Sequence, residues 1–158
     1  DPSYLSWQVK RRAGHTFRFV ELANDVNEHM PDYVVRRATV LLNGKRKPIN
    51  GSRVLVLGLA YKAATSDWRE SPSLQVVEQL LALGADVRAC EPYVPEAGGP
   101  PVPVPVVPCT GDELAAADLV ILLVDHPDFP LGLVAEHSPL VLDTKGVLRP
   151  FAFTGETL

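Results

Sequence analysis

Cysteine and long apolar runs are scarce in this sequence. Its 158 residues include two cysteines, which are too few for a disulfide framework. A reduced, cytoplasmic setting fits this number, although one disulfide between Cys90 and Cys109 stays open. The longest apolar stretch, Leu119 to Val124, is far too short to span a bilayer. We therefore predict a protein that is not embedded in a membrane.

Clustered positive charge and metal-ligand patterns are also missing. The formal net charge is -4 and no long basic run is present, which argues against a nucleic-acid binder. The short basic turn at 44–48 is interpreted as a solvated loop. The four histidines have no metal-ligand spacing, so we predict no metal site and expect these side chains at the surface or at helix caps.

Apolar residues are present in the amount that a globular domain needs. Hydrophobic residues make up 46% of the chain and charged residues 22%, which predicts one soluble domain with a core. Several of the 15 prolines lie in 100–105, where they predict an extended loop. The chain begins at Asp1 without a starting Met or a secretory leader, so we interpret it as a piece of a longer protein.

A helical pattern covers Phe17 to Leu42. Apolar residues recur there at spacings of three and four. Pro31 interrupts the pattern. Because a proline inside a helix removes a donor and clashes with the preceding turn, we predict a kink near Met30-Pro31.

Short apolar runs alternate with helical patterns over the rest of the chain. Strands are expected at 53–57, 86–90, 119–124 and 140–143, and helices from 71 up to Gly84, at 112–117 and at 131–136. Strands that alternate with helices predict a parallel sheet. The predicted fold is therefore a Rossmann-like α/β domain with flanking helices, preceded by a long kinked helix.

The loop after the first predicted strand is the most informative part of the sequence. A dinucleotide fingerprint needs Gly-x-Gly-x-x-Gly followed almost at once by a helix, but this loop has one glycine, Gly58, and its helix begins much later. The loop still lies where open α/β sheets bind ligands, and Lys62 and Arg69 are suited to phosphate oxygens. From composition alone, two surface charges, with Arg69 paired to Glu70 or Asp67, are the favoured interpretation.

Other candidate residues also lie at or near strand ends. Glu91 follows the second strand, where dinucleotide folds place a ribose-binding acid, but without the glycine fingerprint a surface acid is the favoured interpretation. Lys145, in the turn after the last predicted strand, can reach a ligand at the same sheet edge or stay solvated. Trp68 can stack on a base, although packing is the commoner role of tryptophan.

Five strings together resemble one known family. They are Leu55-Val-Leu-Gly-Leu-Ala-Tyr-Lys62, Asp67-x-Arg69-Glu-Ser-Pro72, Glu91-Pro-Tyr93, Asn27-x-x-Met30-Pro-x-Tyr33-Val34 and, at the start, Asp1-Pro-x-Tyr4-Leu-x-Trp7. In this combination the chain resembles the C-terminal UDP-binding domain of the UDP-glucose and UDP-N-acetylmannosamine dehydrogenases, with the preceding linker helix. The resemblance extends to about Gly146.

The resemblance implies roles for individual residues. Asp1 matches an aspartate four positions after the catalytic cysteine, which helps to orient and activate water. Tyr61 and Lys62 match an aromatic–lysine pair at the nucleotide, with the lysine on the diphosphate. Arg69 matches an arginine that reaches NAD. Lys145 matches a substrate-binding arginine, so a bidentate phosphate contact becomes a single point-charge contact.

The resemblance also implies an activity and an organisation. The family oxidises the C6 alcohol of a UDP-sugar to a carboxylate in two steps, with two NAD, in polysaccharide biosynthesis. Residues 1–44 are then expected to be the end of the catalytic segment and a linker helix that builds a homodimer through Phe17 to Leu42, and residues 45–158 the UDP-binding domain. The catalytic cysteine and the main NAD-binding domain are expected outside this chain, which alone should be inactive. The start of the chain favours a UDP-N-acetylhexosamine as substrate.

Two functions of other classes stay open at this point. One is a stand-alone nucleotide-binding module without catalysis, and the other is a protein-interaction domain whose proline-rich loop docks a partner. The beginning of the chain speaks against both, because a stand-alone protein would start with its own Met rather than with part of a catalytic motif.

Overall fold

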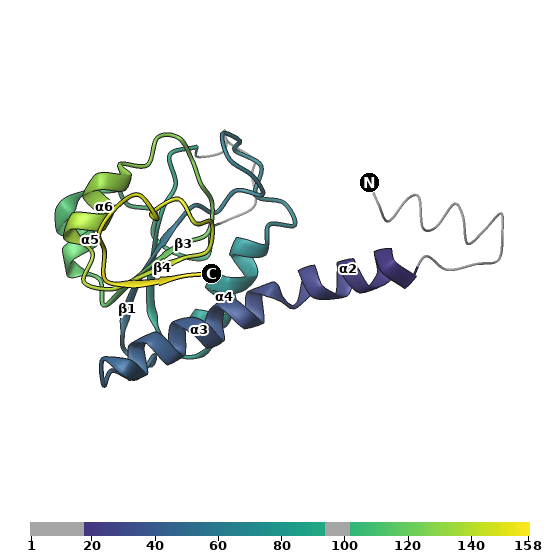
Figure 1. Cartoon of the computed structure of the whole chain (residues 1–158), viewed down its shortest axis with the longest axis horizontal. Coiled ribbons are helices and arrows are strands. Elements are labelled where there is room, and N and C mark those ends of the chain that lie inside the picture. The colour runs from purple at the N-terminus through teal and green to yellow at the C-terminus, as the bar shows by residue number, and fades with distance from the viewer. Residues whose placement is uncertain (1–17, 94–101) are drawn as a thin grey trace.

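Helices cover both faces of a five-stranded parallel sheet within residues 18–93 and 102–158, the part of the chain that the computed structural model describes (Figure 1). The strands are β1 (Arg53–Leu57), β2 (Asp86–Cys90), β3 (Leu119–Leu122), β4 (Val141–Asp143) and β5 (Gly155–Thr157). Their order in the sheet is β2-β1-β3-β4-β5, and every neighbouring pair is parallel. The predicted parallel α/β fold is confirmed.

Each face of the sheet has its own pair of helices. α3 (Met30–Gly44) and α4 (Pro72–Ala82) pack on one face, and α5 (Gly111–Ala116) and α6 (Leu131–His137) pack on the other. β1 contributes to both cores, because successive side chains of a strand point to opposite faces. Val54 and Val56 lie in the core beneath α3 and α4, whereas Leu55 and Leu57 lie beneath α5 and α6. A strand covered on both faces is an unbroken apolar run, which is why it could be predicted.

The long N-terminal helix bends where the proline predicts a kink. α2 (Arg18–Glu28) and α3 meet at His29, and Pro31 lies in the first turn of α3, where a missing N–H is tolerated. The backbone N–H of His29 donates to Asp25 O and that of Tyr33 to His29 O, both at 3.2 Å, so hydrogen bonds continue across the junction. α3 packs on the sheet, whereas α2 has no buried residue and projects away from the domain (Figure 1).

The remaining predicted boundaries lie close to the observed ones. Ser71 caps α4, because its Oγ accepts a hydrogen bond from Ser73 N at 3.2 Å, and Gly84 follows the helix with a φ of +82°. β5 was not predicted. It pairs with β4, and Arg37 of α3 holds it through a hydrogen bond of 2.9 Å from Nε to Glu156 Oε1.

The order of the strands reverses between β1 and β3. The chain runs from β1 through α4 to β2 on one side of β1, and then through α5 to β3 on the other side. Open parallel sheets bind ligands at the carboxyl ends of the strands beside such a reversal. Gly58 directly follows β1 there with a φ of +90°, and a Cβ on it would lie 2.4 Å from Val124 Cβ. A glycine is therefore required for the end of β1 to approach the segment after β3 so closely.

Candidate functional site

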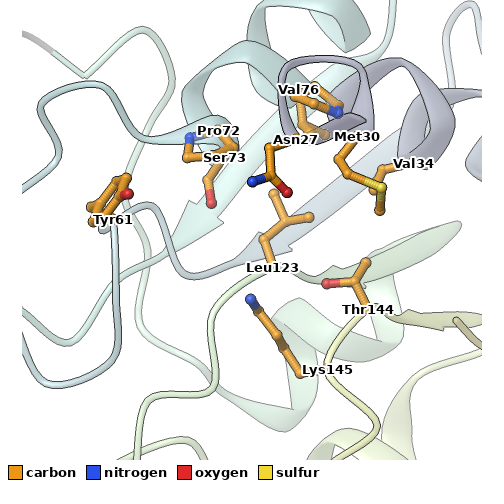
Figure 2. Close-up of a pocket in the computed structure, with 11 residues that line it drawn as sticks. Asn27, Met30, Val34, Tyr61, Pro72, Ser73, Val76, Leu123, Thr144 and Lys145 are labelled. Carbon is orange, nitrogen blue, oxygen red and sulfur yellow. The ribbon is translucent and has the colours of Figure 1, made fainter. Parts of the chain in front are cut away.

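A cavity of about 430 Å³ lies at this edge of the sheet, between the loops that follow β1, β3 and β4 and the junction of α2 with α3 (Figure 2). The residues that line it are Asn27, Met30, Pro31, Val34, Tyr61, Pro72, Ser73, Val76, Leu123, Thr144 and Lys145. Two of the predicted site residues, Tyr61 and Lys145, are among them although they lie far apart in the sequence. The cavity therefore joins two of the loops that the sequence singled out.

The side chains give the cavity one apolar and one polar part. Figure 2 shows Lys145 extending from the loop after β4 with its ammonium directed towards Leu123, while Asn27 points into the same space from α2. Met30 and Leu123 supply apolar surface. Tyr61 lies at the edge of the cavity and is 57% exposed. Such a lining suits a ligand that has both an apolar ring or chain and polar groups.

The N-terminus of α4 adds positive charge to the same cavity. Pro72 and Ser73, the first residues of this helix, both line it. The N-terminus of a helix carries a partial positive charge. Its effect here comes from this charge and not from free N–H groups, since those of Ser73 and Leu74 donate to Ser71. Together with the Lys145 ammonium, this charge favours an anionic group such as a phosphate.

Glu91 shapes the loop that carries Tyr61, and its interpretation as a surface acid is wrong. Its side chain is completely buried, and Oε2 accepts hydrogen bonds from the backbone N–H groups of Leu59 at 2.7 Å and Ala60 at 3.1 Å. Oε1 accepts a third hydrogen bond, from Tyr93 N at 2.9 Å. The carboxyl group therefore fastens the turn after β1 to the end of β2, and it is fully occupied by the protein itself.

His126 completes this support, which corrects the prediction of a histidine at the surface or at a helix cap. Its side chain is fully buried, and Nδ1 accepts a hydrogen bond from Ala64 N at 3.2 Å. Because Nδ1 is an acceptor, Nε2 carries the proton and donates it to Glu91, at 3.1 Å from Oε1 and 3.3 Å from Oε2. The Glu91–His126 pair thus holds both ends of the segment from Leu59 to Ala64.

A second buried carboxylate shapes the loop that carries Lys145. Asp143, the last residue of β4, is 0% exposed. Its Oδ1 accepts hydrogen bonds from Lys145 N at 3.0 Å and Gly146 N at 2.9 Å, and its Oδ2 accepts one from Leu148 N at 2.8 Å. Three hydrogen bonds to one carboxylate fix the path of the backbone after β4 and so hold the main chain of Lys145 in place.

Lys62 and Arg69 are not among the residues that line the cavity with Tyr61 and Lys145. Arg69 donates from Nε and Nη2 to the two carboxylate oxygens of Asp67, each at 2.9 Å, as composition alone suggested, and its side chain is 78% exposed. The hydrogen bonds from Arg69, with a smaller contribution from the charge of Lys62, lower the pKa of Asp67 to about 2. Tyr61, Asp67, Arg69 and Glu70 line a separate hollow of about 450 Å³, so Tyr61 lies between the two.

Asp1 lies outside the described residues. Trp68 is buried and packs in the core beneath α3 and α4, which confirms the packing interpretation. Asn27, Ser73 and Thr144 line the cavity but were not predicted as site residues. Of these three, only Asn27 stands in one of the strings that carry the family resemblance, Asn27-x-x-Met30-Pro-x-Tyr33-Val34.

Within residues 18–93 and 102–158, neither a membrane-spanning helix nor a cluster of metal-ligating side chains is present. None of their helices is long and apolar enough to cross a membrane. Across the same part of the chain, no three side chains of His, Cys, Asp or Glu come together in a way that could hold a metal ion.

Comparison with known proteins identifies one family. Residues 55–150 match the UDP-binding domain of the UDP-glucose/GDP-mannose dehydrogenase family. An NDP-N-acetyl-D-galactosaminuronic acid dehydrogenase from Ralstonia nicotianae is 31% identical over 146 residues, which cover 89% of this chain and 33% of that protein. A UDP-N-acetyl-D-mannosamine dehydrogenase from Methanococcus maripaludis is 31% identical over 152 residues, which cover 90% of this chain and 33% of that protein. The chain thus spans about a third of the length of these relatives.

Solved structures share the fold. An NDP-N-acetyl-D-galactosaminuronic acid dehydrogenase from Methanosarcina mazei superimposes with a TM-score of 0.76 at 22% identity, over 98% of this chain and 36% of that chain. A UDP-glucose dehydrogenase from Pyrobaculum islandicum superimposes with a TM-score of 0.73 at 27% identity, over 94% of this chain and 34% of that chain.

Proposed function

Because the chain belongs to the UDP-glucose/GDP-mannose dehydrogenase family and contains its UDP-binding domain, we propose that it is the nucleotide-sugar-binding part of an NAD-dependent UDP-sugar 6-dehydrogenase. The observation that carries this proposal is the cavity at the carboxyl edge of the sheet. Tyr61 and Lys145, each on a loop fixed by a buried carboxylate, line the same space. We propose that the UDP moiety binds there.

The charges of the cavity assign a role to each group. The Lys145 ammonium binds phosphate oxygens, and the partial positive charge at the N-terminus of α4 favours them there. The apolar side chains of Met30 and Leu123 lie against the less polar parts of the nucleotide. Lys62 follows Tyr61 on the same loop and is exposed, so it reaches the diphosphate from outside the cavity. Tyr61 stands at the boundary and contacts the nucleotide with its ring.

The whole enzyme would oxidise the C6 alcohol of its sugar to a carboxylate in two steps, with two NAD. The relatives named for N-acetylhexosamine derivatives favour a UDP-N-acetylhexosamine as substrate. NAD would bind mainly to a domain outside this chain, since the loop after β1 lacks the glycine fingerprint. Arg69, exposed and paired with Asp67, would contact NAD from this chain, and Asp1 would act in the catalytic segment.

The division of the chain follows from the same proposal. Residues 1–44 would close the catalytic segment and supply the linker helix, and residues 45–158 would bind UDP. This chain alone would not turn over substrate, and we expect the enzyme to work in the cytoplasm.

The linker helix is also proposed to form a homodimer. Five exposed apolar side chains of this helix follow one another at spacings of three and four and form one stripe; they are Phe19 (80% exposed), Leu22, Val26, Met30 and Tyr33. A stripe of this spacing is typical of a helix that packs against another helix. Leu22→Glu should convert a dimer to a monomer in sedimentation velocity, whereas Glu21→Lys, beside the stripe, should not. A wild-type chain that sediments as a monomer at all concentrations would contradict the proposed dimer but not the proposed nucleotide site.

Calorimetric titration tests the nucleotide site. The chain should bind UDP, and NAD much more weakly. Lys145→Ala and Lys62→Ala should each weaken UDP binding about tenfold or more, because a hydrogen bond to a charged group contributes roughly 1.5–3 kcal/mol. Lys45→Ala, which removes an exposed cation from the basic turn, is the matched control and should leave the affinity unchanged.

The three variants separate the parts of the proposal. If Lys62→Ala binds UDP as the control does while Lys145→Ala does not, the cavity holds the nucleotide and Lys62 is a surface charge near Asp67. Tighter binding of NAD than of UDP, or full affinity in Lys145→Ala, would refute the assignment of the cavity.

A further inference from the structure

Both cysteines of the chain lie together on the face of the sheet beneath α5 and α6. Cys90 ends β2, and Cys109 lies just after a short segment that pairs with that strand. In this pairing Ala89 N donates to Pro105 O at 3.0 Å, and Val107 N donates to Ala89 O at 2.8 Å. The two sulfur-bearing side chains join the same apolar cluster and line a cavity of about 310 Å³.

The two thiols differ in exposure and in acidity. Cys90 is buried and Cys109 is partly exposed. Hydrogen bonding between the two thiols raises the pKa of Cys90, with burial adding to the effect, and lowers the pKa of Cys109. Cys109 is therefore the thiol that ionises first and meets reagents from solvent, because the thiolate is the nucleophile.

We propose that Cys90 and Cys109 form a reversible disulfide and so make an oxidative modification site, separate from the nucleotide cavity. The oxidant is a small-molecule disulfide of the glutathione type. The Cys109 thiolate attacks it, forms a mixed disulfide and releases one thiolate. Cys90 then loses its proton to solvent, and its sulfur attacks the Cys109 sulfur and releases the second thiolate. Two protein thiols are oxidised to one disulfide, and one disulfide molecule is reduced to two thiols.

The bond would secure an edge of the sheet. β2 is the outer strand on its side, and the segment at 105–107 pairs along it at Ala89. A disulfide from Cys90 to Cys109 would tie this segment to the strand and would keep the edge covered. In a reducing compartment a bond of this kind is transient and responds to the redox state.

Equilibration of the full chain in glutathione redox buffers, followed by an acid quench, alkylation and intact-mass measurement, tests the proposal. The folded wild-type chain should lose two hydrogens without a glutathione adduct. Cys90→Ala should instead carry glutathione on Cys109. Because a neighbouring thiol acts at an effective concentration of order mM or higher, wild type should hold about tenfold less adduct than this variant. Cys109→Ser should be alkylated about tenfold more slowly than Cys90→Ala, since its remaining thiol is buried.

Three results would overturn the disulfide. In the first, the folded wild-type chain stays fully reduced in the oxidised buffer. In the second, it keeps a glutathione adduct as Cys90→Ala does. In the third, it forms only disulfides between chains. Circular dichroism of both variants establishes that each is folded when it is compared with wild type. The proposal does not rest on nucleotide binding, so UDP affinity is not part of the test.

Discussion

Glu91→Gln removes one charge and leaves the size of a buried side chain almost unchanged. In the native chain both carboxylate oxygens act as acceptors: Oε2 for Leu59 N and Ala60 N, and Oε1 for Tyr93 N and the Nε2–H of His126. A glutamine has one oxygen and one NH₂ group. In either orientation of the glutamine amide, its NH₂ group faces N–H groups that need an acceptor.

The cost follows from the hydrogen bonds that change. A hydrogen bond to a charged group contributes about 1.5–3 kcal/mol, and a buried donor left without an acceptor costs about 1–3 kcal/mol. If the glutamine oxygen stays with Leu59 and Ala60, the N–H of Tyr93 loses its acceptor. We therefore expect Glu91→Gln to lower the free energy of unfolding by about 2–4 kcal/mol, a large part of the stability of a domain of this size.

Urea unfolding followed by circular dichroism measures this difference. Glu136→Gln, the same chemical change on an exposed residue of α6, is the matched control and should lie within about 0.5 kcal/mol of wild type. A stability of Glu91→Gln as close to wild type as that of the control would refute the reasoning. It would mean that the hydrogen bonds to the Glu91 carboxylate do not contribute measurably to the stability of the fold.

Gly58→Ala should lower the free energy of unfolding by about 3 kcal/mol or more in the same assay, because a Cβ there would lie 2.4 Å from Val124 Cβ at a φ of +90°; wild-type stability would contradict the close approach. For Asp118, the hydrogen bond from Lys47 lowers the pKa, so this pair stabilises the fold above the unfolded carboxyl pKa of about 3.9 and the effect is lost as the pH falls through the lower folded value. Asp118→Asn should therefore be less stable than wild type by about 1 kcal/mol at neutral pH, and the gap should close in acid; a gap that does not change with pH would count against the pair. If the proposed site is correct, Lys145→Arg should tighten UDP binding several-fold in calorimetry, because a guanidinium can contact phosphate with two N–H groups; weaker binding would indicate that the ammonium is placed for one contact.

Local patterns were sufficient to predict most of the elements. The apolar run of β1, the cap at Ser71 and the bend at Pro31 each depend on residues near in sequence, and the structure has all three. β5 had no such signal. Its three residues, Gly155–Thr157, have no apolar alternation, and the strand depends on pairing with β4 and on an ion pair with Arg37. A short strand that forms because it pairs with residues distant in sequence has no local sequence pattern that predicts it.

The expectations for Glu91 and His126 failed for one structural reason, which involves contacts between distant loops. Glu91 was expected at the surface because an acid at a strand end is usually exposed, and His126 because the histidines lack metal-ligand spacing. Their burial depends on the loops after β1, β2 and β3 meeting above the sheet, where backbone N–H groups need acceptors. The cavity is similar in this respect, since Asn27 and Lys145 come together only when the bent helix lies across the sheet edge.

The buried carboxylates also give a physical reason for the expectation that this sheet edge binds NAD much more weakly than UDP. In the glycine-rich turn of a dinucleotide-binding fold, backbone N–H groups after the first strand face the pyrophosphate. Here the N–H groups of Leu59 and Ala60 donate to Glu91, and those of Lys145 and Gly146 donate to Asp143. Four backbone donors near the strand ends are thus satisfied inside the protein and cannot bind phosphate. The first N–H groups of α4 are satisfied as well, because Pro72 has none and those of Ser73 and Leu74 donate to Ser71. If the proposed site is correct, an anion at this edge is held mainly by side-chain cations, so a nucleotide that depends on a main-chain cradle should bind poorly, whereas one held by Lys145 should bind.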